Sequence, residues 1–397
     1  MNFINSPNFR AAVARFQSGS TRKRISKAKL CTIELPLPPS SEQRRIVEAI
    51  ESYFTRLDDA VATLERVQRN LKRYRASVLK AAVEGRLVPT EAELAHAEGR
   101  DYEPASVLLE RVLAERRRRW HEAGVRGKYE EPVAPDATEL PGLPEGWCWA
   151  SVGRLLREPL RNGHSARKVV DGDVRTLTLT AVTERDFSEI NTKLTAADQQ
   201  QVQDLWLEHD DIFVERSNTP ELVGTAAIYR GQRGFAIFPD LLIRVRPVRD
   251  VLPLYVEAVL RSSRARTFFR RAAQGIAGSM PKISQETVAA LAVPLPPSME
   301  QARIVAELER QLSVADEAET SVTICQTRCA RLRQSILKWA FEGKLADQDP
   351  NDEPASALLE RILTETAARV AGAPNGASSK PRRRRGTMTG TKLAKQR

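Results

Sequence analysis

The stretch LPLPPSSEQRRIVEAI at Leu35–Ile50 returns as VPLPPSMEQARIVAEL at Val293–Leu308, an offset of 258 residues (293 − 35). VLKAAVEGRL at Val78–Leu87 and ILKWAFEGKL at Ile336–Leu345 keep this register. A third block matches at an offset of 250 residues (353 − 103): EPASVLLERVL at Glu103–Leu113 and EPASALLERIL at Glu353–Leu363. Many short repeats stacked on one another would predict a solenoid, whereas two copies around a longer, different segment predict a pair of matching helical elements.

Each copy has the signature of a long amphipathic helix. Prolines stiffen its entry, Ser40 or Ser298 suits the N-cap, and a glutamate two residues later suits the helix dipole. Apolar residues then recur at steps of three and four. They are Ile46, Ile50, Phe54, Leu57, Val61, Leu64, Leu71 and Val78 in the first copy, and Ile304, Leu308, Leu312, Ala315, Val322, Cys329 and Ile336 in the second. The simplest partner for one such helix is the other.

A helix over about residues 41–83 would be roughly 65 Å long, a spacer comparable with two turns of DNA. Gly85 and Gly343 are expected to end the two helices, and Pro104 and Pro354 to open shorter ones. The mixture of Gly, Pro and acidic residues in 124–142 predicts a linker.

Between Trp147 and Pro294 the pattern changes to short β-type runs separated by turn residues. The expected strands are Thr176–Thr183, Ile212–Val214, Thr225–Tyr229, Ala236–Phe238 and Leu241–Val245, and the expected helical stretches are Ala196–Leu207 and Leu254–Ala273. The fold class is therefore α+β, with one α+β domain and two long repeated helices.

The net charge of +11 is weak evidence for a nucleic-acid partner, because residues 372–397 hold eight Lys/Arg and no acid, which leaves +3 (11 − 8) elsewhere. Local charge is more informative. Met1–Ile33 and Ala258–Gln285 each carry basic residues and no acid.

Several classes of protein are disfavoured. Four cysteines without metal-ligand spacing predict reduced thiols, and no apolar run approaches the roughly 20 residues of a membrane helix. No phosphate-binding loop, HExxH or GxSxG motif occurs, and the four histidines are scattered. We expect a soluble cytoplasmic protein without catalytic, metal or cofactor site.

The repeated PLPPSxEQxRIV pattern, the LKxAxEGxL ending and the middle segments resemble type I restriction-modification specificity subunits. The segments are LPEGWCWASVGRLL at Leu143–Leu156, DDIFVERSNTPELVGTAAIY at Asp210–Tyr229 and GSMPKISQETVAALAVPLPP at Gly278–Pro297. The resemblance implies a DNA-recognition subunit with an antiparallel coiled-coil spacer, directing methylation and cleavage at a bipartite site on double-stranded DNA. It also implies two modification subunits and a restriction/translocase subunit as partners, which carry S-adenosylmethionine, ATP and Mg.

The same resemblance divides the chain. Residues 1–34 match only the tail end of a first target-recognition domain, and 35–123 form the first helical repeat. The linker 124–142 precedes a target-recognition domain at 143–292, a second repeat at 293–371 and a basic tail at 372–397, expected to be disordered. A second copy of the chain is a further candidate partner. Lys80–Leu87 and Lys338–Leu345 are candidate docking surfaces for modification subunits, with packing inside the subunit as the alternative.

Candidate DNA contacts follow from residue chemistry. Phosphate neutralisation favours Arg270, Arg271 and Lys282 in the acid-free stretch. Base reading favours the loop residues Arg216, Ser217, Asn218 and Thr219, because Arg suits guanine and Asn suits adenine. Arg161, Asn162 and His164, with Lys168, form a second polar loop, and Ser279 is expected near the DNA as a flexible position. For each residue, turn chemistry or a solvated helix face is the alternative.

Two other functions stay open. A coiled-coil scaffold that binds only protein explains the repeated helices but not the paired basic segments. A non-functional fragment of a specificity subunit is the other alternative. DNA binding that depends on sequence separates the scaffold from the main interpretation, whereas the absence of a new methylated motif would favour the fragment or the scaffold. An enzyme with an unfamiliar site is disfavoured because no catalytic residues are clustered, and activity of the isolated chain would revive it.

Overall fold

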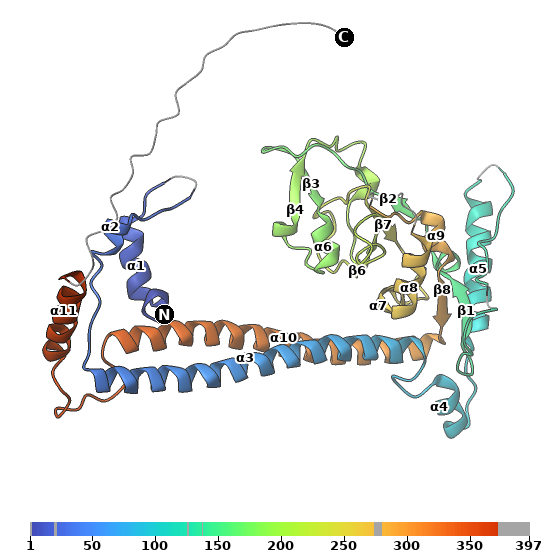
Figure 1. Cartoon of the computed structure of the whole chain (residues 1–397). Helices are drawn as coiled ribbons and strands as arrows, with labels where there is room; N and C mark the ends of the chain where they lie inside the picture. Colours follow the sequence, from blue (N-terminus) through green and yellow to red (C-terminus); the bar gives the residue numbers. More distant parts are fainter. Residues whose placement is uncertain (1, 20–21, 125–126, 137, 274–279, 372–397) are drawn as a thin grey trace, which may run out of the picture. The chain divides into compact units, whose positions relative to one another are not determined.

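The computed structural model describes residues 2–19, 22–124, 127–136, 138–273 and 280–371 (Figure 1). The chain divides into two compact units. Unit 1 combines residues 1–63 with 326–397, and unit 2 is residues 64–325. The two long helices, α3 (Ser40–Val83) and α10 (Ser298–Phe341), each contribute to both units.

Unit 1 holds α1 (Pro7–Phe16), α2 (Lys27–Leu30), α11 (Ala355–Ala371) and one part of each long helix. The start of α3 packs against the end of α10 through Ile46, Ile50, Ile336 and Ala340. Arg333 pairs with Asp58, and its guanidinium lies 4.7 Å from the centroid of the Phe54 ring. Low numbers on α3 meet high numbers on α10, so the two helices run antiparallel within this unit.

Unit 2 holds the other parts of the long helices with α4 (Glu91–Glu98) and α5 (Ala105–Glu122). Tyr74 Oη of α3 is 3.1 Å from Gln311 Oε1 of α10. Arg75 lies 2.5 Å from both Asp316 and Glu319. The helix pairing is antiparallel in this unit as well, as the resemblance implied.

The α+β domain of unit 2 contains three small antiparallel sheets. The central one has the strand order β2-β7-β5-β6, formed by Arg161–Asn162, Leu242–Val245, Ile212–Glu215 and Ala226–Ile228. β1 (Cys148–Ser151) pairs with β8 (Ala292–Leu295), and β3 (Val174–Leu177) pairs with β4 (Thr192–Thr195). Alternation along β5 divides its side chains between two cores, with Ile212 and Val214 in one and Phe213 in the other.

Helices α6 (Leu179–Thr183), α7 (Pro253–Arg261), α8 (Ser263–Ala272) and α9 (Gln285–Ala290) complete this domain. Short 3-10 turns lie at η1 (Phe3–Asn5), η2 (Val152–Leu155), η3 (Glu189–Asn191) and η4 (Gln203–Leu205). In unit 2, α5 lies along β1 and η2, where Leu108 and Val112 join the core (Figure 1).

Three local predictions were wrong. The expected strand Thr176–Thr183 ends at Leu177, and α6 follows it. The expected helix Ala196–Leu207 is irregular apart from η4, and Ala236–Phe238 forms only an isolated bridge at Ile237. These segments are short, so tertiary contacts override their intrinsic preferences.

The helix starts also differ from the expectation. Ser40 and Ser298 are the first helical residues rather than N-caps, and the carbonyls of Pro39 and Pro297 accept the first helical hydrogen bonds. The predicted C-terminal ends of the two long helices are confirmed, since α3 ends at Val83 and α10 at Phe341. Both following glycines have positive φ: Gly85 at 67° and Gly343 at 68°.

Candidate nucleic-acid interface

One end of the central sheet gathers residues from segments far apart in the sequence. β5 ends at Glu215, and the backbone N–H of Arg216 donates to the carbonyl of Leu241, just before β7. The N–H of Ile283 donates to the carbonyl of Arg216 over 2.9 Å. Ser217 and Lys282 form an antiparallel bridge. The loop after β5 is thereby joined to the segment that precedes α9.

The end of β2 lies at the same end of the central sheet as the loop after β5. Asn162 pairs with Ile243 in β7, and its side-chain amide lies 3.1 Å from that of Gln285 in α9. The N–H of His164 donates to the carbonyl of Phe238. We name Asn162, His164, Arg216, Thr219 and Lys282 the sheet-end cluster. The predicted second loop was partly wrong, because Arg161 and Asn162 form strand β2.

Two cations of this cluster are not neutralised by acids. Lys282 is exposed and Arg216 half-buried, and neither has an ion-pair partner in the described ranges. Thr219 is exposed, whereas Ser217 is buried and contributes through its backbone bridge. Unpaired cations beside exposed polar groups are the combination that phosphate and base contacts require.

Asn218 has its amide committed inside the turn. Its Nδ2 donates to Glu215 over 2.6 Å, and its Oδ1 accepts from the N–H of Thr219. These contacts use one of the two donors on Nδ2 and one of the two acceptor positions on Oδ1, and they orient the amide within the turn. Burial raises the pKa of Glu215, although hydrogen bonds from Thr183 and Asn218 oppose that shift. The turn contacts that the sequence left open as the alternative are therefore present at Asn218, and its contact with a base stays a prediction.

Helix α8 is tied to the same loop. Arg266 donates to the carbonyl of Val223 over 2.9 Å and also contacts the carbonyl of Glu221. Arg270 and Arg271 are exposed in the last turn of α8. Burial, followed by the charge of Arg270, lowers the pKa of Arg266. Ser279 lies outside the described residues.

Arg161 and Lys168 are directed elsewhere. Arg161 pairs with Asp204 over 3.2 Å, and Lys168 bridges to Thr195 beside β4. The structure therefore separates these two from the sheet-end cluster, although the sequence grouped them with Asn162 and His164.

Sequence reasoning missed a buried ionic group on β7 and just beyond it. Arg246 makes two hydrogen bonds to Asp211, and Arg244 lies 3.1 Å from Glu158. Arg244 is almost fully buried, and burial lowers its pKa. The signal was the alternation of Ile243 and Val245 with arginines, which places both cations on one face. These charges lie inside the fold and hold its loops together.

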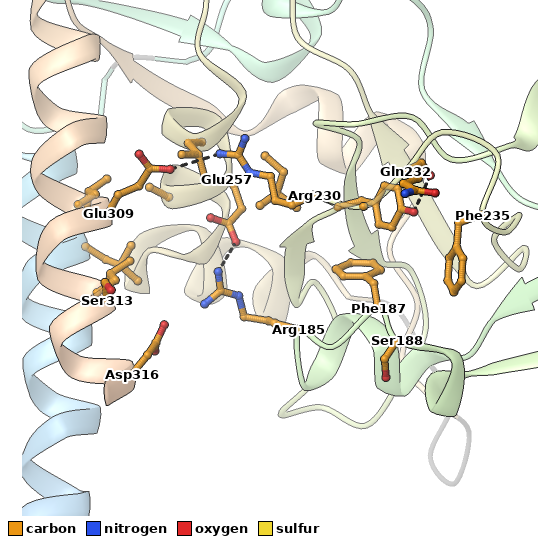
Figure 2. A pocket seen from close by; sticks show the side chains of 18 of the residues that line it. Arg185, Phe187, Ser188, Arg230, Gln232, Phe235, Glu257, Glu309, Ser313 and Asp316 are labelled. Carbon is orange, nitrogen blue, oxygen red and sulfur yellow. Dashed lines mark hydrogen bonds and ion pairs between the residues drawn. The ribbon is translucent and has the colours of Figure 1, made fainter. Parts of the chain in front are cut away.

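A hollow of about 780 Å³ separates the sheet from α10 inside unit 2. Figure 2 shows Arg230 reaching across it to Glu309 of α10, at 3.6 Å. Arg230 also pairs with Asp210 over 2.7 Å, and the buried Glu257 pairs with Arg185 over 3.3 Å. The pair between Arg230 and Glu309 connects the α+β domain to α10 within the unit, and the other two pairs lie inside that domain.

Neither a metal site nor a membrane helix occurs in the described ranges. No three His, Cys, Asp or Glu side chains there are grouped closely enough to hold a metal ion. None of the helices in those ranges has the length and apolar character that a membrane crossing needs.

Comparison with known proteins shows which class of protein the chain is similar to. Residues 8–68 match the family described as the type I restriction modification DNA specificity domain. The EcoKI specificity subunit of Escherichia coli (strain K12) is 29% identical over 378 residues, which cover 92% of this chain and 71% of that protein. The StySPI specificity subunit of Salmonella potsdam is 27% identical over 378 residues, which again cover 92% of this chain and 71% of that protein.

A solved structure described for complex assembly of the type I R-M system has a TM-score of 0.51 at 19% identity. The matched region covers 86% of this chain and 70% of the chain in the solved structure. This likeness supports the fold. The chain is thus similar over most of its length to specificity subunits of type I restriction enzymes, and this similarity supports the role of a DNA sequence-recognition subunit.

Proposed function

We propose that the sheet-end cluster and the end of α8 form the DNA-contacting surface of this recognition subunit. The observation that carries the proposal is the backbone pairing of the segment after β5 with the segment before α9, at Ser217 and Lys282, which places two segments with unpaired cations at one end of the central sheet. Arg216 beside exposed Thr219 supplies donors suited to base edges. Arg270 and Arg271 supply phosphate contacts.

The chain itself makes and breaks no bond in this proposal. It directs methylation and cleavage by separate modification and restriction/translocase subunits in the cytoplasm, at a bipartite site in double-stranded DNA. The repeated helix ends at Lys80–Leu87 and Lys338–Leu345 are the proposed docking surfaces for the modification subunits. A palindromic target would indicate that two copies of the chain act together, since protein symmetry is mirrored in the DNA half-sites.

Methylation profiling tests the proposal. The chain is expressed with its modification subunit, and the methylated motifs of the host DNA are compared with those of cells that lack the chain. We expect one gapped motif to appear. Arg216→Ala should relax one position of that motif, because removing a base contact costs about 1–3 kcal/mol of discrimination. Lys282→Ala should weaken methylation at all sites alike.

Arg233→Ala is the matched control. Arg233 is also an exposed arginine of this domain, but it pairs with Glu208 near the start of β5, away from the sheet-end cluster. It should leave the motif and its level of methylation unchanged. If Arg216→Ala and Lys282→Ala behave like this control while wild-type methylation is present, the DNA-contacting surface lies elsewhere. Complete absence of a motif from an expressed complex would favour the fragment or scaffold alternatives.

A further inference from the structure

The loop between β5 and β6, residues 216–225, carries the candidates for base reading, and we name it the β5–β6 loop. Its second half is a turn, because the N–H groups of Leu222 and Val223 both donate to the carbonyl of Thr219 over 2.9 Å. In the part of the chain that the structure describes, no backbone N–H donates to the carbonyls of Glu221 and Val223. These two carbonyls are therefore available to a side chain from another element.

Arg266 of α8 supplies the missing donors. Its Nη1 donates to the carbonyl of Val223 over 2.9 Å, and its Nη2 donates to the carbonyl of Glu221. The carbonyl of Leu222 lies 3.5 Å from the same Nη1. A guanidinium is planar and its donors have fixed directions, so a side chain that reaches two carbonyls of one turn fixes both the position and the orientation of that turn.

The β5–β6 loop touches α8 at a second point. Gly224 has a φ of 74°, a conformation that favours glycine, and it lies against the ring of Phe269. An added Cβ on Gly224 would be 2.6 Å from Phe269 Cδ2. Phe269 is fully buried, and it shares a face of α8 with Arg266, three residues earlier. One face of this helix therefore holds the second half of the loop.

The same helix ends in the arginines that are candidates for phosphate contacts. Arg270 and Arg271 are exposed in the last turn of α8, about one turn beyond Arg266. The helix starts at a defined point, because the side chain of Ser262 accepts a hydrogen bond from the N–H of Ala265. Since the backbone hydrogen bonds of a helix keep its residues at a fixed spacing, α8 sets the distance between the phosphate-contacting arginines and the β5–β6 loop.

We propose that Arg266 is a positioning residue that sets sequence specificity by fixing the β5–β6 loop to α8, without contacting DNA. This role rests on the proposed DNA-contacting surface. Base reading needs hydrogen bonds of about 3 Å with good alignment, so a small displacement of the loop removes the contact of Arg216 with a base edge. When α8 is held against the phosphates, the anchored loop brings Arg216 to the same base each time.

Hydrogen exchange of the full-length chain without DNA tests the anchoring. Arg266→Met keeps an apolar stem and removes the donors. The amides of residues 222–225 should then exchange about tenfold faster or more, since hydrogen bonds from a charged donor are lost. Arg233→Met is the matched control, because Arg233 is an exposed arginine that pairs with Glu208 instead. Loop exchange in Arg266→Met as slow as in this control would overturn the proposal.

Methylation profiling in the complex with the modification subunit tests the effect on specificity. Arg266→Met should relax the motif position that Arg216→Ala relaxes, with at least about a fivefold loss of preference for the correct base. Arg266→Lys keeps the charge but not the planar pair of donors, so it should restore only part of that preference. A motif that stays unchanged, with methylation reduced equally at all sites, would show a purely structural role and contradict the proposal.

The salt dependence of DNA binding separates positioning from phosphate contact. Arg266→Met should keep the wild-type slope of log affinity against log salt concentration, whereas Arg270→Ala should reduce that slope by about 0.9. The same reduction in Arg266→Met, fully reversed in Arg266→Lys, would make Arg266 a phosphate contact and refute its positioning role.

Failure of the proposed DNA-contacting surface gives a different result. In that case Arg216→Ala leaves the motif unchanged, and the specificity role of Arg266 falls with the surface even where the loop exchanges faster. If Arg216→Ala relaxes the motif and Arg266→Met does not, the surface stands and only the positioning role is wrong.

Discussion

At the residue scale, Glu215 shows how a buried carboxylate organises the candidate interface. It is fully buried at the end of β5, and it accepts hydrogen bonds from Thr183 and from Asn218 of the loop after β5. Its neighbour Arg216 is half-buried, so a fully buried acid and a partly exposed cation are adjacent in sequence. The loop conformation that presents Arg216 therefore depends on Glu215.

The raised pKa of Glu215 predicts a pH effect. Burial raises the pKa of the Glu215 carboxyl in the folded protein above the ordinary value of 4.5. Just above pH 4.5, this carboxyl therefore binds more protons in the folded than in the unfolded protein. Stability conferred by this group therefore falls as pH rises from 4.5 through the folded pKa. Glu215→Gln removes this dependence, because Gln can donate to Thr183 and still accept from Asn218. We expect the variant to melt at the same or a higher temperature at pH 7, and its advantage to shrink toward pH 4.5.

The comparison is made by thermal melting of both proteins between pH 4.5 and pH 8. Glu48→Gln, an exposed carboxylate, should give a pH profile parallel to that of the wild type. A Glu215→Gln variant that is markedly less stable at pH 7 would show that the negative charge itself is needed, which would contradict this account.

Gly85 and Gly343 form a matched pair for a second prediction. Both have φ near +67°, so alanine at either position costs about 1 kcal/mol in backbone strain. Only at Gly85 would the added Cβ collide with Pro144 and Trp147. Gly85→Ala should therefore lower the melting temperature more than Gly343→Ala. Equal shifts would mean that Pro144 and Trp147 yield without cost.

At this scale the sequence indicated part of the site. Arg216 and Lys282 were chosen from their residue type and from the acid-free stretch, and the structure pairs the backbone segments that carry them. Asn218 was chosen on the same chemistry, yet its amide is used inside the turn. Side-chain partners depend on residues distant in sequence, such as Thr183, so spacing alone does not identify a free donor.

At the element scale, α5 and α11 carry nearly the same sequence in two environments. Leu109, Val112 and Leu113 of α5 are buried against β1 and η2, and the matching residues of α11 are exposed. Their helical conformation is predictable from sequence, because Pro at the start and apolar spacing are local signals. Their burial is not, since it depends on what another segment supplies.

This difference predicts unequal effects of the same substitution. Val112→Asp places an unpaired charge in the core and should destabilise unit 2 by several kcal/mol, of the order of 3–5 kcal/mol. Ile362→Asp should change stability by about 0.5 kcal/mol or less, because residue 362 is on the surface. Thermal melting of the two variants in parallel measures the contrast. A large loss in Ile362→Asp would show that the exposed face of α11 is covered in the isolated chain.

Long helices were better predicted than short elements. α3 and α10 have sustained three- and four-residue periodicity, which identifies their type and approximate ends. The segment Ala196–Leu207 has a short apolar pattern that does not distinguish helix from irregular chain. Its conformation is decided by contacts such as the hydrogen bond from the N–H of Leu207 to the carbonyl of Ala236.

At the scale of the whole molecule, charge is unevenly distributed along the chain. Eight of the Lys and Arg residues lie in 372–397, and removing them reduces the net charge from +11 to +3 (11 − 8). Nonspecific affinity for DNA follows such charge, whereas specificity follows base contacts. The tail and the sheet-end cluster are therefore expected to have separable effects.

A chain that ends at residue 371 tests this separation. We expect weaker binding to nonspecific DNA and a shallower salt dependence, by about 0.9 in the log–log slope for each phosphate that the tail no longer neutralises. The recognised motif should be unchanged in methylation profiling. Ser substitutions at Arg382–Arg385 provide a control of equal length. An altered motif in the shortened chain would give the tail a part in recognition.

The sequence by itself determined the repeat, the two long helices with their ends, the α+β class of the middle domain and its basic segments. These features depend on local periodicity, on proline and glycine geometry and on residue chemistry, all of which can be read along one chain. Only the tertiary structure decided that the segments of Arg216 and Lys282 pair, that Asn218 hydrogen-bonds within its turn, and that one face is buried on α5 but exposed on α11. Those outcomes depend on contacts between distant segments, which spacing along the chain does not specify.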